Sequence, residues 1–226
     1  MELGIPVYEG VDLLDVAGPY EMFKWVDEKK GLRTVILSED GHSVTSGNGL
    51  RFEVHATFAA TPTLDVLWVP GGAAEIMQNM MLNPESAYLT YLRKVATGAK
   101  WICSVCEGAL LLARAGLLDG HRATTHWAVV RCLQGFPKID VDVTNPRFVE
   151  SGNRLTGGGI SSGLDEALKL ITLLFDEKTA VAVQQTTQYF PKPPVWGNIP
   201  AAPACTIHWQ TKKQNSAKGP LTRSRK

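Results

Sequence analysis

One cysteine stands where a predicted strand gives way directly to a predicted helix. Cys106 follows the apolar stretch 101–105, and a second apolar stretch, 109–113, begins three residues later. Unpaired N–H groups and the positive end of a helix dipole favour the thiolate of such a cysteine and lower its pKa. Ligands of open α/β sheets bind beyond the carboxyl ends of the strands, where this turn places the thiol. The pattern therefore predicts a nucleophile elbow, a strained turn that presents the attacking atom.

This segment alone leaves other interpretations of Cys106 open. A buried structural cysteine is the commonest fate of a free thiol. Cys103 and Cys106 could form a redox pair, but Cys103 lies inside the predicted strand, whereas such a pair opens the helix with its first cysteine. A zinc site would need a second pair of ligands at the right spacing, which the sequence lacks, so we expect no metal.

An acid and a histidine are further candidates for the chemistry. Asp15 lies within the apolar run 13–17. Such a carboxylate is either a cap for the helix predicted to begin near Pro19 or a working acid or base. His126, within Thr-Thr-His-Trp at 124–127, is the one histidine in a context that could be functional. A lone histidine is more often a structural residue than a catalyst.

Two glycine-containing turns end predicted strands, at 70–72 and 156–159. Free backbone N–H groups at such turns can form an oxyanion hole, although flexible loops also use glycine. The residues that we expect to position the substrate are Gly72, Ala73, Glu107 and Gly108. The residues that we expect to contact and support the reacting residues are Thr125, His126, Trp127 and Gly158. The sequence has no P-loop and no G-x-G-x-x-G after a strand, so we expect no cofactor.

Short apolar strands alternate with helices through most of the chain, and this order must position the candidates. The predicted strands are 3–7, 32–37, 66–69, 100–105 and 154–156, with a hairpin at 44–54. The predicted helices are 19–29, 84–97, 107–115, 162–175 and 178–189. Alternation of this kind implies βαβ units. We therefore predict an α/β fold, a three-layer sandwich with a mostly parallel central sheet.

Composition and charge exclude several classes of partner. The chain has 226 residues, 44% of them hydrophobic, which suits one domain. Its net charge of +1 gives no electrostatic case for nucleic acid or an anionic membrane. No apolar run is long enough to span a bilayer, and the first residues do not resemble a signal peptide. Three of the four cysteines lie in regular-looking segments, so we expect reduced thiols and a cytoplasmic protein.

The C-terminal part differs from the rest. Five prolines between residues 189 and 204 prevent regular structure. From residue 211 to the end the chain has six Lys or Arg and no acid. We predict one α/β domain over 1–204 and a disordered basic tail over 205–226. Binding of nucleic acid by this tail is an alternative to simple solvation.

Three stretches resemble the ThiJ/PfpI superfamily: Ser-Val-Cys-Glu-Gly at 104–108, Ala-Gly-Leu-Leu-Asp-Gly at 115–120, and Arg-Ala-Thr-Thr-His-Trp at 122–127. The likeness extends over about residues 4–200 and implies the flavodoxin-like fold of class I glutamine amidotransferases. Within the superfamily, the chain resembles the isonitrile hydratases in particular. That likeness rests on Leu-Asp-Val-Ala-Gly-Pro-Tyr-Glu at 14–21, Leu-Thr-Gly-Gly-Gly-Ile at 155–160, and Tyr189 with prolines 191, 193 and 194.

The resemblance implies Cys106 as the nucleophile, Asp15 as the general acid and base, and a homodimer with both sites near its interface. The implied reaction converts an isonitrile into an N-substituted formamide without a cofactor. Relatives that act on glyoxals or peptides often carry glutamate in place of Asp15. One departure is Glu107, where the hydratases have threonine, because a carboxylate beside a thiolate opposes ionisation of both. Either Glu107 points away and caps the helix, or the substrate differs.

Two other classes of function stay open. One is a different enzyme on the same scaffold, a glyoxalase, deglycase or amidase that acts through Cys106. The other is a non-enzymatic redox-sensing or ligand-binding module. Some relatives carry this domain fused to a helix-turn-helix regulator, and no residues that could form one follow the domain here, so we expect an enzyme.

Overall fold

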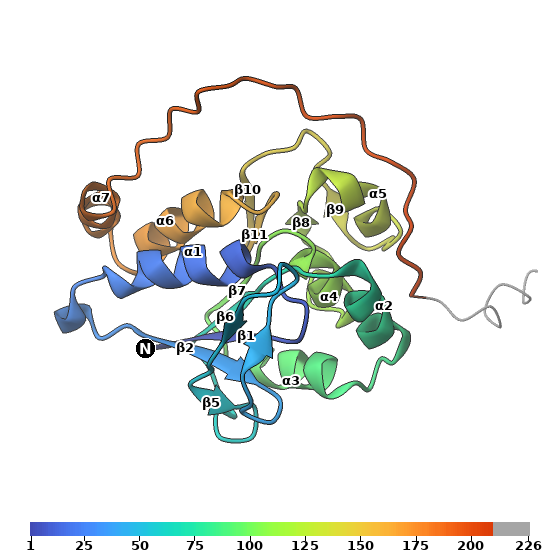
Figure 1. Cartoon of the computed structure of the whole chain (residues 1–226), viewed down its shortest axis with the longest axis horizontal. Coiled ribbons are helices and arrows are strands. Elements are labelled where there is room, and N and C mark those ends of the chain that lie inside the picture. The colour runs from blue at the N-terminus through green and yellow to red at the C-terminus, as the bar shows by residue number, and fades with distance from the viewer. Residues whose placement is uncertain (210–226) are drawn as a thin grey trace, which may run out of the picture.

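Seven strands form one sheet in the computed structural model, which describes residues 1–209 (Figure 1). The strand order is β10-β11-β7-β6-β1-β2-β5, and neighbours run parallel except for β10 and β11. The strands are Glu2–Pro6 (β1), Arg33–Ser38 (β2), Ala56–Thr57 (β5), Val66–Val69 (β6), Trp101–Ser104 (β7), Phe148–Ser151 (β10) and Arg154–Gly157 (β11). The predicted mostly parallel sheet is confirmed.

Helices cover both faces of this sheet and complete three layers (Figure 1). They are Leu13–Lys24 (α1), Ala74–Leu82 (α2), Ala87–Ala96 (α3), Gly108–Arg114 (α4), Val130–Leu133 (α5), Ser162–Leu174 (α6) and Glu177–Thr186 (α7). On one face α1 packs on α6 and α6 on α7, whereas α2, α3 and α4 contact one another on the other. None of the helices within residues 1–209 has the length and apolarity that a bilayer crossing requires.

Short elements complete the fold. Two small sheets pair Val44–Thr45 (β3) with Arg51–Phe52 (β4) and Arg122–Ala123 (β8) with Asp140–Val141 (β9). Two 3-10 helices span Glu28–Lys30 (η1) and Trp127–Val129 (η2). The antiparallel pairing of β3 with β4 confirms the predicted hairpin.

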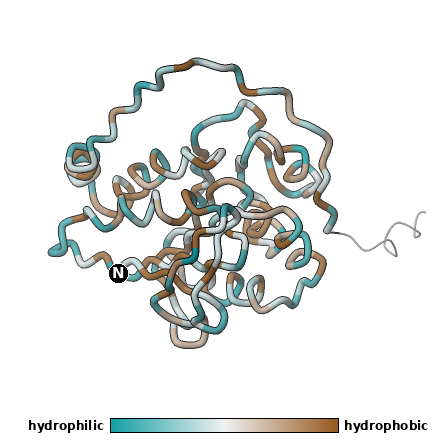
Figure 2. The backbone as a smooth tube through the Cα atoms, in the orientation of Figure 1, coloured by the Kyte–Doolittle hydropathy of each residue, from teal (hydrophilic) through white to brown (hydrophobic). Residues whose placement is uncertain are grey.

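The central strand β6 is apolar along its whole length because helices cover both faces of the sheet. All four residues of β6 are buried, and the ring of Trp68 packs edge-on against Phe23 of α1, with 5.4 Å between the ring centroids. Figure 2 shows hydrophobic residues concentrated along the central strands and on the inner sides of the helices. This core gives the loops at the carboxyl edge of the sheet a rigid base.

The first helix begins six residues earlier than predicted, at Leu13, and Pro19 lies inside it. An internal proline removes the N–H that would bond to the carbonyl four residues before it, here that of Asp15. The indole Nε1 of Trp68 donates to this carbonyl at 3.2 Å and so replaces the missing partner. Asp15 is therefore a residue of the first helical turn and not a cap for a helix that begins at Pro19.

A second difference lies between β6 and β7, where the sequence predicted one helix over 84–97. The structure has two helices, because α2 begins almost directly after the glycine turn at 70–72, in a segment for which the sequence predicted no helix. The Ser86 hydroxyl accepts a hydrogen bond from the Leu89 N–H at 3.4 Å and caps the start of α3.

The chain after α7 has no helix or strand up to residue 209, as its prolines predict. Residues 190–204, here called the strap, run as an extended arc from α7 towards α5 (Figure 1). Cys205, at the end of the strap, is bonded to Cys132 of α5. The expectation that all four cysteines are reduced is therefore wrong. A pairing across 73 residues could not be inferred from spacing, since Cys205 was placed in a tail.

The residues that follow Cys205 also pack against the domain. Ile207 is only 2% exposed, and Trp209 stacks on Phe136 with 4.5 Å between the ring centroids. The packed part of the chain thus continues past residue 204, to the end of the described residues. The rest of the predicted basic tail, residues 210–226, lies outside them.

Candidate active site

Cys106 occupies the sharp turn between β7 and α4. Its backbone φ is 57°, in the left-handed region that a residue other than glycine rarely adopts. Two hydrogen bonds hold this conformation: the Cys106 N–H donates to the Gly158 carbonyl at 2.8 Å, and the Thr125 hydroxyl donates to the Cys106 carbonyl at 2.7 Å. The predicted strained turn is present, and the thiol within it is buried, because Cys106 is only 1% exposed.

Gly108 explains why α4 can begin so soon after this turn. A Cβ at this position would clash with the backbone carbonyl of Val69 in β6. Gly108 thus allows close approach of α4 to a packed strand, whereas its role in positioning the substrate stays a prediction.

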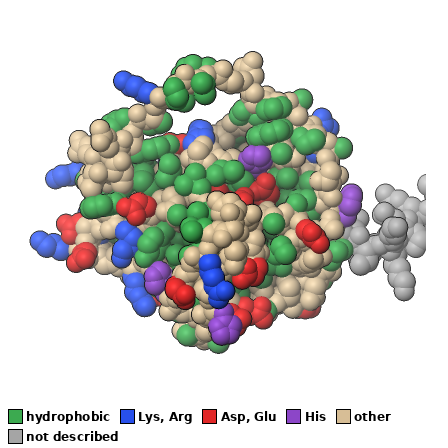
Figure 3. Space-filling view, viewed as in Figure 1, with side chains coloured by type: hydrophobic (Ala, Val, Ile, Leu, Met, Phe, Trp, Pro, Cys, Tyr) green, Lys and Arg blue, Asp and Glu red, His purple; other side chains and the backbone are tan. Residues whose placement is uncertain are grey.

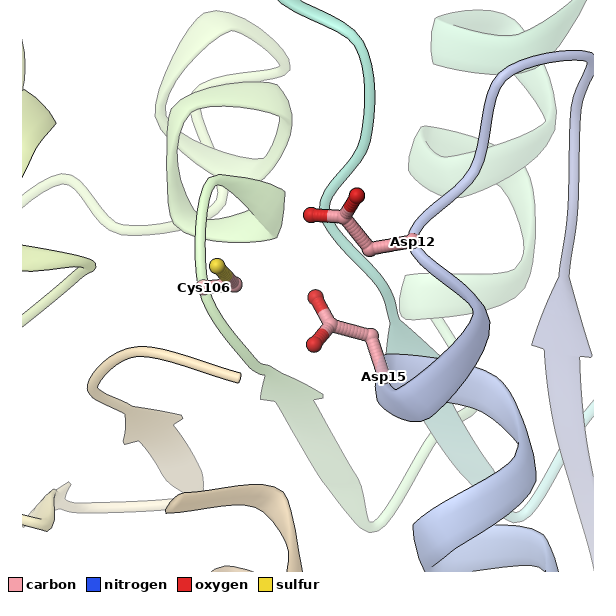
Figure 4. A group of neighbouring side chains, drawn as sticks. All are labelled: Asp12, Asp15 and Cys106. Atoms are coloured by element: carbon pink, nitrogen blue, oxygen red, sulfur yellow. The ribbon is translucent and has the colours of Figure 1, made fainter. Parts of the chain in front are cut away.

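Asp15 reaches the cysteine from the first turn of α1 (Figure 4). Its Oδ2 accepts a hydrogen bond from the Gly71 N–H at 2.9 Å, whereas Oδ1 is buried without a hydrogen-bond partner among the described residues. Burial raises the pKa of Asp15 well above its usual value, and the hydrogen bond from Gly71 opposes this shift. A carboxyl group whose pKa is raised in this way can hold a proton and release it in the course of a reaction.

Asp12, which the sequence reasoning missed, adds a third group to this pair. One ligand-type atom from each of Asp12, Asp15 and Cys106 lies within 4.8 Å of the others (Figure 4). Burial raises the pKa of Asp12, and the charge of Glu107 adds to the shift. The signal was available, since residues three apart at a helix start share one side of the helix.

Glu107 turns towards the site and does not cap α4, whose N-terminus has no side-chain cap. A Cβ added at Gly71 would lie 2.7 Å from Glu107 Oε2 and 3.0 Å from Asp15 Oδ2, so Gly71 lies between the two carboxyl groups. Glu107 Oε1 lies 3.7 Å from Nδ1 of His126. The same Nδ1 accepts a hydrogen bond from the Ala128 N–H at 3.3 Å. An ion pair between His126 and Glu107 therefore requires a protonated ring. The alternative in which Glu107 points away is wrong.

The surroundings of Cys106 favour the neutral thiol. Burial raises its pKa well above the usual value, the charges of Asp15 and Glu107 raise it further, and the Ile160 N–H opposes the shift. The prediction that the helix N-terminus lowers this pKa is therefore wrong. The start of the seven-residue α4 does not outweigh burial and two neighbouring carboxylates.

The turn at 70–73 supports Asp15 more than it offers donors to a substrate. The Ala73 N–H donates to the Gly10 carbonyl at 2.8 Å, so it is not free to bind an oxyanion. At Gly72 a Cβ would lie 2.7 Å from the same carbonyl, which explains the glycine. The loop after β1 and the turn after β6 are thus locked together around Asp15.

The predicted residues behind the site line a cavity of about 330 Å³. Its walls are Thr125, His126, Trp127, Asn145, Pro146, Arg147, Gly158, Gly159, Ile160, Ser161, Ser162 and Ile199. Cys106 and Asp15 are not among them, but Thr125 and Gly158 hydrogen-bond the backbone of Cys106. The cavity therefore begins directly beside the cysteine turn.

Two further buried groups belong to β7 and to α6. Cys103 is a free thiol inside β7, which does not favour a redox pair with Cys106. Glu166 of α6, which the sequence reasoning missed, is fully buried, and neither of its carboxyl oxygens has a hydrogen-bond partner among the described residues. Burial raises the pKa of Glu166 well above its usual value, and the charge of Asp15 adds to the shift.

The chain belongs to the DJ-1/PfpI family, whose profile matches residues 2–173, so the predicted ThiJ/PfpI resemblance is confirmed. It is 36% identical to isonitrile hydratase of Pseudomonas putida, over 92% of this chain and 87% of that protein. It is 27% identical to the HTH-type transcriptional regulator GbdR of Pseudomonas aeruginosa, over 83% of this chain but only 50% of the regulator. A crystal structure of a ThiJ/PfpI family protein from Pseudomonas syringae superposes with a TM-score of 0.76 at 34% identity, covering 86% of this chain and 77% of that one.

Proposed function

We propose that this protein hydrates isonitriles to N-substituted formamides, with Cys106 as the nucleophile and Asp15 as the proton carrier. The observation that carries the proposal is the buried Asp15 carboxyl group, with one oxygen unpartnered among the described residues, next to the Cys106 thiol. The similarity to isonitrile hydratase of Pseudomonas putida supports the choice of substrate class.

The first step adds the thiol to the substrate. An isonitrile, R–N≡C, has an electrophilic terminal carbon and no leaving group. The Cys106 sulfur forms a bond to this carbon, and Asp15 carries the thiol proton to the same carbon. The product is a thioimidate, R–N=CH–S–Cys106. Because this addition consumes the thiol proton, a resting site that keeps Cys106 protonated suits the chemistry.

The second step releases the product and restores the thiol. Asp15 accepts a proton from water as the water oxygen bonds to the thioimidate carbon, and it passes this proton to the substrate nitrogen. The C–S bond then breaks as the remaining hydroxyl group becomes the formamide carbonyl, the proton of that hydroxyl group returns to the sulfur, and R–NH–CHO leaves. Division of one difficult hydration into two easier steps is the benefit of covalent catalysis. The raised pKa of Asp15 suits a group that must give and accept a proton in one cycle.

We also propose that the protein works as a homodimer. Leu14, next to Asp15 in α1, and Ile160, which lies in the turn after β11 and whose N–H points to Cys106, are apolar and exposed, and a second copy would cover them. Sedimentation equilibrium of the purified protein tests this: a dimer mass at micromolar concentration supports it, and a monomer mass contradicts it.

The direct test is product formation from a panel of isonitriles and glyoxals, followed by NMR. The proposal requires formamide from isonitriles and a loss of at least about a thousandfold in Cys106→Ala. Turnover of methylglyoxal without turnover of isonitriles would show that the protein is a glyoxalase or deglycase instead.

A further inference from the structure

Four of the side chains that line the cavity beside Cys106 are apolar. Trp127, Ile160, Pro146 and Ile199 line it, while Thr125 and Gly158 form its end at the cysteine turn. These residues leave room for a substituent that extends away from the reacting carbon.

The one cationic side chain among the lining residues, Arg147, is already neutralised. Its Nε donates to Asp165 Oδ2 at 2.6 Å, and its Nη1 donates to the Ser161 hydroxyl at 3.1 Å. The cavity therefore suits a neutral, apolar group better than an anion.

Ile199 differs from the other residues that line the cavity because it belongs to the strap. All the others lie between residues 125 and 162 of the chain. The strap arches over the body of the protein with an opening beneath it (Figure 3). Its middle makes little contact with the domain, and Val195 is 75% exposed. Ile199 thus needs an anchor elsewhere to stay in the wall.

That anchor lies just beyond Ile199. The Arg131 Nε donates to the Ala202 carbonyl at 2.9 Å, and Cys205 is bonded to Cys132. Both partners belong to α5, which follows directly after η2, the 3-10 helix that begins at Trp127. The helix that continues from Trp127 therefore also holds the strap that supplies Ile199 to the cavity lining.

We propose that Ile199 is a specificity-determining residue that selects substrates by the size of an apolar R group, and that the Cys132–Cys205 disulfide keeps it in place. The choice of isonitriles as substrates rests on the proposed function, whereas the wall itself does not. Bulky alkyl and aryl isonitriles are the preferred substrates, because their R group fills the cavity that Trp127 and Ile199 help to line. Small isonitriles gain little from this wall.

The test compares Ile199→Ala with Val195→Ala, a control on the same strap that does not line the cavity. For each variant we measure kcat/KM for methyl and for benzyl isonitrile, and the rates at which iodoacetamide and N-benzyl iodoacetamide alkylate Cys106, identified by peptide mass. In Ile199→Ala the preference for the benzyl compound should fall roughly three- to tenfold in both assays. Val195→Ala should match the wild type. An unchanged preference in Ile199→Ala, or equal changes in both variants, overturns the proposal.

The anchor is tested with Cys205→Ser and, as a milder release of the strap, Arg131→Ala. Each should lower the benzyl preference in the direction of Ile199→Ala, and combining either with Ile199→Ala should add little. If both keep the wild-type preference, the disulfide does not hold the wall. Alkylation needs no turnover, so a wild type inactive on isonitriles refutes the proposed function and still lets the wall be judged.

Discussion

The indole Nε1 of Trp68 donates a hydrogen bond to the backbone carbonyl of Asp15 at 3.2 Å, the bond that Pro19 cannot make. A core strand thereby fixes the helix residue that carries the carboxyl group of the site. The Gly71 N–H holds the side chain of the same residue at 2.9 Å. Asp15 is thus positioned through its backbone by β6 and through its side chain by the turn that follows β6.

Trp68→Phe should destabilise the protein by about 1–3 kcal/mol, because it leaves the buried Asp15 carbonyl without a partner. Unfolding in urea measures the change. Trp25→Phe is the matched control, since Trp25 is 51% exposed and its Nε1 bonds only to Glu21 on the surface. Equal losses of unfolding free energy in the two variants would mean that the hydrogen bond to Asp15 stabilises the protein no more than the surface bond of Trp25 does.

Glu107→Thr should lower the pKa of the Cys106 thiol, because it removes a neighbouring negative charge that disfavours the thiolate. Titration of the thiolate by its ultraviolet absorbance measures the shift, and alkylation at neutral pH should become severalfold faster. Glu75→Gln, an exposed change in α2, should leave both unchanged. A titration curve identical to that of the wild type would show that Glu107 does not influence the thiol.

Much of this arrangement could be predicted from the sequence. Buried strands have continuous apolar runs, and the abrupt change from apolar strand to helix at Cys106 predicted the turn correctly. The early start of α1 could not be predicted, because it depends on a contact between residues 53 apart in the chain. This contact is the hydrogen bond from the Trp68 indole to the Asp15 carbonyl, which replaces the bond that Pro19 cannot make. The bond between Cys132 and Cys205 likewise depends on where the strap returns to the domain.

The electrostatics of the site were harder to predict than its geometry. The dipole of α4 arises only from the residues after Cys106. Burial and the carboxyl groups of Asp15 and Glu107, in contrast, determine the direction in which the pKa of the Cys106 thiol shifts. Glu166 gave no signal because one acid in an amphipathic helix pattern does not reveal that its side chain points into the core.

Glu166 should make the stability of the protein depend on pH. Its pKa is raised in the folded state, so the folded protein holds the proton more tightly than the unfolded chain does. The stabilisation that this provides is complete below the unfolded pKa of a glutamate and is lost as pH rises towards the folded value.

Glu166→Gln removes that dependence. We compare the unfolding free energy of the variant with that of the wild type at each pH. As the pH rises from mildly acidic to mildly alkaline, this difference should shift by more than about 1 kcal/mol in favour of the variant. Urea unfolding across this range measures it, with exposed Glu85→Gln as the control. A constant difference between Glu166→Gln and wild type at every pH would show that Glu166 titrates alike in both states.

The central claim is that Asp15 cycles a proton for Cys106, and turnover of an isonitrile by Asp15→Asn tests it most directly. The amide keeps the shape of the side chain but cannot carry a proton. We expect Cys106 in this variant to be alkylated at least as fast as in the wild type, because a negative charge that disfavours the thiolate is removed, while formamide production falls by about a hundredfold to ten thousandfold. Asp15→Glu should also be poor, because the added methylene moves the carboxyl group into the space of the substrate carbon. Formamide production by Asp15→Asn at close to the wild-type rate would contradict the account.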